Sequence, residues 1–303
     1  FYLPLLHSLS SGEWFTSRTS AALLFASVYE KIPLSMRADV HSMFVSLCTD
    51  ETPMVRRAAA RDMSALVKRM SPEVIINEML PLYRRLSADD QDSVRLLTVQ
   101  NLVAMAEVLS PAETQQLLLS SICGAFQDKS WRVRYMAADN FVQLATAVGE
   151  DVVKEDLVPA YINLMRDAEA EVRTAAATQL PGLAKLLDQN TIIERLLPVA
   201  KELADDPSQH VRGALAAQVS ALAPLLGKDA TTEHLLPLFL QLLKDEFPEV
   251  RLNIISRLEQ VNEVIGIDLL SQSLLPAIMT LAEDKQWRVR QAIIENIQLL
   301  AHQ

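Results

Sequence analysis

The segment DKSWRVRYM at residues 128–136 returns almost unchanged as DKQWRVRQA at residues 284–292. The first residues of the two copies differ by 156 (from 128 to 284), which is four steps of 39 residues. This step holds along the chain, because a Val-Arg pair recurs at the same interval and an Asp stands five residues before each Val. The pairs start at residues 55, 94, 133, 172, 211, 250 and 289. Self-similarity at a fixed period of this size is typical of repeat architectures, so the period decides the fold.

Each period reads as two helices joined by a short turn. In SVRLLTVQNLVAMAEVL, residues 93–109, apolar residues follow one another at intervals of three and four, as on one face of an amphipathic helix. At six of the seven boundaries between periods a Pro or Gly marks a helix boundary. These residues are Pro33, Pro72, Pro111, Gly149, Gly227 and Gly266. A second proline is predicted to kink or restart the first helix. It occurs at Pro81, Pro159, Pro198, Pro237 and Pro276.

A unit of two helices and about 40 residues is typical of HEAT repeats. We therefore expect an all-α fold, a right-handed α-α superhelix (HEAT-repeat solenoid) with about eight repeats of 39 residues. No linker or change of composition divides the chain, so residues 1–303 are expected to form a single array that is a fragment of a longer one. The first repeat is degenerate, with Thr16 and Ser17 in place of Val-Arg. The repeat marks fall at about 11–18, 50–57, 89–96, 128–135, 167–174, 206–213, 245–252 and 284–291.

The repeated Asp and Arg are predicted to have a structural role. The Asp falls in the turn between the helices and the Arg in the first turn of the second helix, so stacking would align them into a ladder between neighbouring repeats. Such a partly buried ladder is expected to fix the register of the repeats more than to add net stability. The predicted ladder consists of Asp50, Arg56, Asp89, Arg95, Asp128, Arg134, Asp167, Arg173, Asp206, Arg212, Asp245, Arg251, Asp284 and Arg290.

Composition and motifs argue against several classes of function. The net charge of −10 disfavours nucleic acid as a partner, and no apolar run reaches the ~18 residues of a membrane span. The His and Cys residues show no metal-ligand spacing, and no phosphate-binding loop or nucleophile motif is present. We therefore expect no enzyme, no cofactor and no metal, and a cytoplasmic location that extends to the nucleus.

The three tryptophans suggest a protein-binding edge. Because their residue numbers differ by multiples of 39, Trp14, Trp131 and Trp287 are assigned to one position of the repeat, at the start of the second helix. Asp or Gln stands at this position in other repeats. Packing of each indole on a neighbouring turn is one interpretation. The other is a row of contacts for partner proteins, because Trp, Tyr and Arg dominate interface energetics. The candidate binding residues are Trp14, Phe15, Arg18, Pro53, Arg57, Trp131, Arg132, Tyr135, Trp287 and Arg288.

Several segments resemble the scaffold (A, or structural) subunit of protein phosphatase 2A, in the central portion of that family's array. They are GEWFTSRTSA, TPMVRRAAA, DQDSVRLL, DKSWRVRYM, HLLPLFLQLLKDEFPEVRLNIIS and VNEVIGIDLLSQSLLPAI. The resemblance implies a non-catalytic scaffold that holds an exchangeable regulatory subunit together with the phosphatase catalytic subunit on the ridge of intra-repeat turns.

By position, the resemblance places the two kinds of partner on different parts of the chain. Trp14, Phe15, Pro53, Arg57, Trp131 and Arg132 would face regulatory subunits on the N-terminal side. Trp287 and Arg288 would belong to the first turn of the catalytic-subunit side, which is incomplete in this chain. The alternatives are a HEAT-type transport receptor with an acidic inner surface, another protein-binding adaptor, and a nucleic-acid-binding HEAT protein.

Overall fold

The computed structural model describes residues 2–301, and the side chains of residues 2–296. Within residues 2–301 every regular element is a helix, which confirms the predicted all-α class. The chain divides into two compact units, Phe1–Gly149 and Glu150–Gln303, called here the N-terminal and C-terminal units. The boundary follows Gly149, one of the predicted repeat boundaries. The single array stays a prediction.

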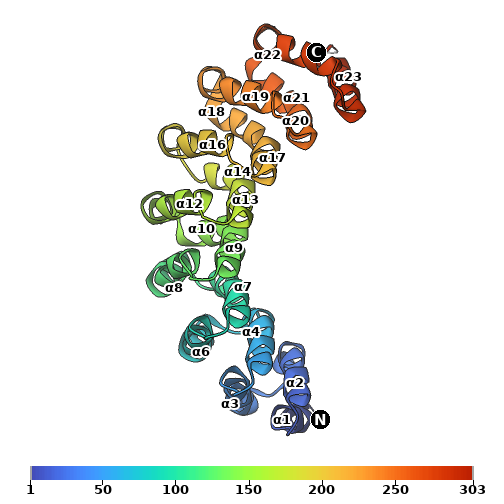
Figure 1. The fold of residues 1–303 in the computed structure, drawn as a ribbon. Coiled ribbons are helices and arrows are strands. Elements are labelled where there is room, and N and C mark those ends of the chain that lie inside the picture. Colours follow the sequence, from blue (N-terminus) through green and yellow to red (C-terminus); the bar gives the residue numbers. More distant parts are fainter. Residues whose placement is uncertain (1, 302–303) are drawn as a thin grey trace. The chain divides into compact units, whose positions relative to one another are not determined.

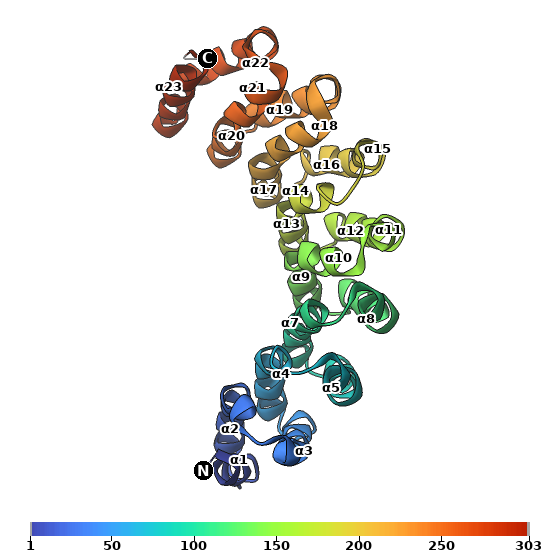
Figure 2. The ribbon, with the colours of Figure 1, turned by 180° about the vertical axis from the view of Figure 1, so that it is seen from behind.

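The N-terminal unit contains two rows of helices (Figures 1 and 2). One row holds the first, or A, helices of the repeats, and the other holds the second, or B, helices, with neighbouring B helices in contact. The A row consists of α1 (Tyr2–Ser10), α3 (Arg37–Cys48), α5 (Pro72–Val74) continued by η3 (Ile75–Met79) and α6 (Leu80–Ser87), and α8 (Pro111–Phe126). The B row consists of α2 (Phe15–Val28), α4 (Pro53–Val67), α7 (Asp92–Val108), and α9 (Trp131–Asp139) with α10 (Phe141–Val148). Two short 3₁₀ turns, η1 (Tyr29–Lys31) and η2 (Leu34–Met36), connect α2 to α3.

The C-terminal unit repeats the same plan. Its A row consists of α11 (Glu150–Val152), η4 (Val153–Leu157) and α12 (Val158–Met165); α15 (Gln189–Thr191), η5 (Ile192–Leu196) and α16 (Leu197–Leu203); η7 (Thr231–Leu235) and α19 (Leu236–Leu243); and α22 (Ile267–Ala282). Its B row consists of α13 (Ala170–Thr178) and α14 (Leu180–Ala184); α17 (Gln209–Gln218) and η6 (Val219–Leu222); α20 (Pro248–Ile255) and α21 (Leu258–Ile265); and α23 (Trp287–Ala301). Helix α18 (Ala223–Ala230) bends at Gly227 and joins one repeat to the next.

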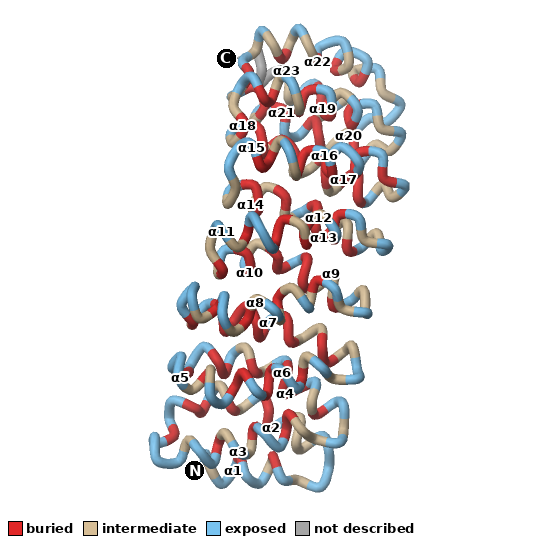
Figure 3. Tube along the Cα trace, turned by 90° about the vertical axis from the view of Figure 1, so that its left-hand side faces the viewer, coloured by how far each residue is buried: buried red, intermediate tan, exposed pale blue. Residues whose placement is uncertain are grey.

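The core of each unit lies between its two rows, where the buried segments gather (Figure 3). The seven repeated Val residues are at most 2% exposed, so their predicted core position is confirmed. A second core position near the end of each repeat is also buried, at Leu66, Met105, Leu144, Leu183, Leu222 and Val261. Leu300, its counterpart in the last repeat, lies outside the described side chains. Because each repeat exposes an apolar face that its neighbour covers, stability is a sum of nearest-neighbour interfaces.

The repeated prolines and glycines act at the predicted places. Of the five prolines predicted to kink or restart the first helix, four follow a five-residue π-helical segment, η3, η4, η5 or η7. Such a segment accommodates the ring that an α-helix would exclude. Pro276 is the exception, since it lies inside α22. Gly149, Gly227 and Gly266 have φ values of 76–88°, a left-handed region that glycine enters without steric cost.

Helix B is less regular than predicted. It breaks near its middle in four consecutive repeats, between α9 and α10, α13 and α14, α17 and η6, and α20 and α21. At the first break the Asn140 amide donates to the Met136 carbonyl and accepts from Gln100. A side chain that bonds to the backbone in this way competes with the helical ladder and favours a bend.

Candidate protein-binding edge

An Arg–Asp ladder joins successive intra-repeat turns, as predicted. In each of five consecutive-repeat pairs the Arg of one repeat reaches the Asp of the next, with closest N···O distances of 2.6–3.0 Å. The pairs are Arg56–Asp89, Arg95–Asp128, Arg173–Asp206, Arg212–Asp245 and Arg251–Asp284. Arg134 and Asp167 lie in different units, so their pairing stays a prediction. Arg290 donates to the carbonyl of Asp284 in its own turn.

Each ladder Arg also ties its own turn together. Arg95 donates Nη1 to the carbonyls of Asp89 and Asp90, while its Nε and Nη2 donate to the two carboxylate oxygens of Asp128. The Asp128 carboxylate in turn accepts the backbone N–H of Ser130, the residue before helix α9. One Arg therefore fixes the conformation of its own turn and binds the Asp of the next turn. That Asp in turn holds the residue before the next B helix in place. The ladder holds successive turns side by side within each unit.

The ladder carboxylates of the N-terminal unit have lowered pKa values. Burial would raise the pKa of Asp50, Asp89 and Asp128, but the hydrogen bond from the partner Arg, a backbone N–H and the charge of the Arg together outweigh burial and lower it. The charged carboxylates are therefore more stable in the folded state than in the unfolded chain.

The N-terminal unit is expected to lose stability in acid. A carboxyl group whose folded pKa is lowered stabilises the fold above its unfolded pKa, near 3.9 for Asp, and this stability is lost as the pH falls further. The urea midpoint of this unit, followed by hydrogen exchange, should therefore fall steeply below about pH 4. Asp89→Asn should be less stable at pH 7 but less sensitive to acid. Equal acid sensitivity of this variant and the wild-type chain would contradict a role for the ladder carboxylates.

Two Trp–Arg pairs stand at the starts of B helices. Trp131 and Trp287 are the first residues of α9 and α23, and the guanidinium of the following Arg lies over each ring, 4.9 Å and 5.7 Å from its centre. Trp287 is 59% exposed and Trp131 is half-buried. Arg132 also approaches Asp92 at 3.7 Å, and Asp92 accepts a hydrogen bond from Ser130. The exposed Trp287 argues against packing as the sole role of this position.

The assignment of Trp14 to the same position is wrong. Trp14 precedes α2 and Phe15 is its first residue, so Phe15 corresponds to Trp131 and Trp287. The first repeat is therefore one residue shorter between its ladder Arg and the next ladder Asp, which are 32 residues apart (Arg18 and Asp50) instead of 33 as for Arg56 and Asp89. Arg18 then occupies the ladder position, and it pairs with Asp50 at 2.6 Å and donates to the carbonyls of Gly12 and Glu13. Arg18 is thus a ladder residue, and Ser17 is not the counterpart of the ladder Arg.

The remaining candidates lie on the exposed side of the same turns. Pro53 begins α4, and Arg57 and Tyr135 follow one turn into their helices with exposed side chains. The sequence prediction missed Met54, which is 58% exposed and lies at the position of Arg132 and Arg288. The period could have found Met54, because 54, 132 and 288 differ by multiples of 39. Trp14, at 73% exposed, remains on this edge although its position differs.

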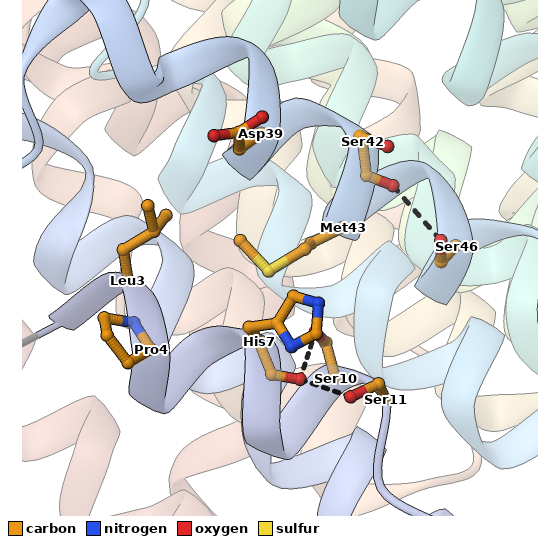
Figure 4. A pocket seen from close by; sticks show the side chains of 9 residues that line it. All are labelled: Leu3, Pro4, His7, Ser10, Ser11, Asp39, Ser42, Met43 and Ser46. Atoms are coloured by element: carbon orange, nitrogen blue, oxygen red, sulfur yellow. Dashed lines mark hydrogen bonds between the residues drawn. The ribbon is translucent and has the colours of Figure 1, made fainter.

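Other parts of the described chain offer less to a ligand. A hollow of about 580 Å³ lies between α1 and α3, lined by Leu3, Pro4, His7, Asp39, Met43 and four serines (Figure 4). Three of the four serine hydroxyls, those of Ser10, Ser11 and Ser46, donate to backbone carbonyls of their own segment, so they offer no free donor to a ligand. In residues 2–301 no group of three or more acidic, His or Cys residues is placed to hold a metal, and no helix reaches the length and apolarity that crossing a membrane requires.

The fold and the repeated turns define the chain as a HEAT-repeat protein. The family description "PPP2R1A-like HEAT repeat" matches residues 150–227, and "HEAT repeat" matches residues 235–265 and 274–303. "PIK3R4-like, middle domain" matches residues 74–186. The sequence is 50% identical to the "Protein phosphatase 2A scaffold subunit" of Dictyostelium discoideum over 82 residues. It is 49% identical over 73 residues to the "Serine/threonine-protein phosphatase PP2A 65 kDa regulatory subunit" of Drosophila melanogaster, and 47% identical over 75 residues to a probable PP2A regulatory subunit of Caenorhabditis elegans.

Over these segments the chain is similar in sequence to the scaffold subunit of protein phosphatase 2A, as the sequence segments indicated. The matches cover 24–27% of this chain and only 12–14% of these relatives. The relatives carry the names of scaffold or regulatory subunits, in agreement with the prediction of a protein that is not an enzyme.

Solved structures confirm the fold alone. Kap95p, in a structure with RanGDP, aligns with a TM-score of 0.75 at 14% identity over 99% of this chain and 41% of its own. The karyopherin Kap121p, bound to the C-terminus of Cdc14p, aligns with a TM-score of 0.69 at 14% identity over 97% of this chain and 33% of its own. At this level of identity the likeness extends to the helical solenoid and not to partners.

Proposed function

We propose that the chain is a non-catalytic scaffold segment that binds subunits of a Ser/Thr protein phosphatase along its intra-repeat turns. The observation that carries the proposal is the pair of Trp–Arg stacks at the starts of α9 and α23, in a chain whose relatives are scaffold subunits. A Trp at the end of a rigid helix gives a large contact area at a low cost in conformational entropy. The ladder holds these turns in place before a partner arrives, which reduces the cost of binding.

The two kinds of partner are assigned to different turns. We assign regulatory subunits to the turns of the N-terminal unit, including Pro53, Arg57 and Trp131, and the catalytic subunit to the turn with Trp287 and Arg288. Holding both on one chain would raise the concentration of each near the other. A cytoplasmic location, extending to the nucleus, is part of the same proposal.

The test measures the binding of purified phosphatase subunits to the immobilised chain. Trp131→Ala is expected to weaken at least one regulatory subunit, and Trp287→Ala the catalytic subunit, each by roughly 30-fold, as for an interface hot spot of about 2 kcal/mol. Leu34→Ala is the matched control, because Leu34 is an exposed apolar residue in η2, outside the intra-repeat turns. Unchanged affinities with a lowered melting temperature would instead assign the tryptophans to packing. Capture of basic cargo in place of phosphatase subunits would favour a transport receptor.

A further inference from the structure

A groove with an apolar floor and a basic rim crosses three B helices of the N-terminal unit. It has a volume of about 410 Å³ and is lined by residues of α2, α4 and α7. Leu23 and Met54 are 56% and 58% exposed, although both are large apolar side chains. The lining residues are Thr19, Ser20, Leu23, Met54, Arg57, Ala58, Arg61 and Leu97. Exposed apolar groups gathered in one hollow are typical of an interaction site, whereas single scattered ones are not.

The hydroxyl groups of the groove are already satisfied by its own helix. Thr19 and Ser20 both donate to the carbonyl of Thr16, each at 2.9 Å. They therefore contribute no free donor that would select a polar ligand. The specificity of the groove must come from its apolar surface and from its two arginines.

The arginines stand four residues apart on α4, so they project from one face of the helix. Arg57 is exposed and makes no hydrogen bond or ion pair in the described part of the chain. Arg61 shares its charge with Asp62 at 3.0 Å but keeps half of its side chain exposed. An unpaired guanidinium beside an apolar hollow, on a chain of net charge −10, is an attractive local site for a carboxylate.

We propose that this groove binds an acidic amphipathic segment of a partner protein. One apolar side chain of the segment would lie between Leu23 and Met54, and carboxylates one helical turn apart would pair with Arg57 and Arg61. An amphipathic helix laid in an apolar groove is a recurring mode of recognition, read through side chains at intervals of three and four. This inference rests on the proposed function, since it names the segment that a regulatory subunit would place on the N-terminal unit.

The test uses a labelled helical peptide of about 16 residues, long enough to form a helix across the groove. It carries two leucines four residues apart and glutamates at the flanking positions, and its binding to the whole 303-residue chain is measured by fluorescence anisotropy. Leu23→Glu and Arg57→Glu are each expected to weaken binding at least tenfold. A sister peptide with lysine in place of every glutamate should bind at least tenfold more weakly than the acidic one, and added salt should weaken the acidic peptide.

Arg69→Glu is the matched control, because it makes the same change of charge just beyond the end of α4. It lies roughly 18 Å along the helix from Arg57, at about 1.5 Å per residue. This variant should bind the peptide as the wild-type chain does, and circular dichroism should show that all three variants keep their helices. Equal binding of the acidic and basic peptides, or unchanged binding by Leu23→Glu, overturns the proposal. So does equal competition by a single-stranded oligonucleotide, which would make the groove a general anion site.

The same variants separate this inference from the proposed function. If Leu23→Glu abolishes peptide binding but no regulatory subunit binds the wild-type chain, the groove stands and the phosphatase partner is wrong. If regulatory subunits bind and neither Leu23→Glu nor Arg57→Glu changes their affinity, the scaffold function stands and the groove is not their contact.

Discussion

Val172→Asp is expected to unfold the C-terminal unit first, by lowering its unfolding free energy by about 4–5 kcal/mol. Val172 lies in α13 and is fully buried. The carboxylate would lose its hydration without gaining a partner, or would have to take up a proton at a similar cost. Because repeats contact only their neighbours, the damage should be greatest around the fifth repeat and decrease with distance along the array.

Hydrogen exchange resolved along the sequence measures this gradient. Amides of α12, α13 and α17 should exchange fastest, while those of α2 and α4 keep their protection. Ala168→Asp is the control, because Ala168 is exposed in the turn before the same helix and should change stability by no more than about 0.5 kcal/mol. A uniform loss of protection over all repeats would show that the chain unfolds as one cooperative unit.

The sequence period predicted most of the fold because it records the geometry of stacking. A Val that recurs every 39 residues is buried each time, and an Asp and an Arg at fixed offsets meet in the next repeat. Both features arise because the same repeat is stacked again and again, so a role assigned to one position of the period applies to that position in every repeat. The same logic explains the positive φ of Gly149, Gly227 and Gly266, because all three stand at the same position, at the end of a repeat.

Departures from the period could not be predicted in the same way. The first repeat has one residue fewer between Arg18 and Asp50 than later repeats have between their ladder residues, and the tryptophan at position 14 satisfied the period by coincidence. What identifies the shift is Arg18, because its bond to Asp50 shows which residue holds the ladder position. A one-residue shift changes which side chain begins the helix, so the candidate site changed with it: Phe15 takes the place that Trp14 was given.

The breaks in helix B depend on side-chain bonds that the apolar pattern does not record. Asn140 and its counterpart in α7, Asn101, occupy the same place in the period, yet only the helix at Asn140 breaks. Asn140 bonds to a backbone carbonyl and to Gln100, whereas Asn101 is fully buried and its amide makes no hydrogen bond. For these two asparagines, the difference between a straight and a broken helix therefore follows the hydrogen bonds of the side chain and not the residue type.

Arg95→Ala is expected to destabilise the N-terminal unit by about 3–5 kcal/mol, the cost of breaking a buried ion pair at one partner. The Arg95 and Asp128 side chains are 6% and 14% exposed, so the carboxylate left behind would be buried without its counter-ion. The carbonyls of Asp89 and Asp90 would lose their donor as well. Urea unfolding followed by circular dichroism and hydrogen exchange measures the loss.

A matched surface pair and a double variant show what the ladder contributes. Arg69→Ala breaks the exposed pair with Glu30 and should cost less than about 1 kcal/mol. Arg95→Met combined with Asp128→Asn removes both buried charges and keeps an acceptor for the N–H of Ser130, so it should cost clearly less than Arg95→Ala alone. That result would show that the ladder fixes which turns face each other while adding little net stability. A double variant as damaged as the single one would instead show that the ion pair itself stabilises the array, and the ladder would then be a main source of its stability.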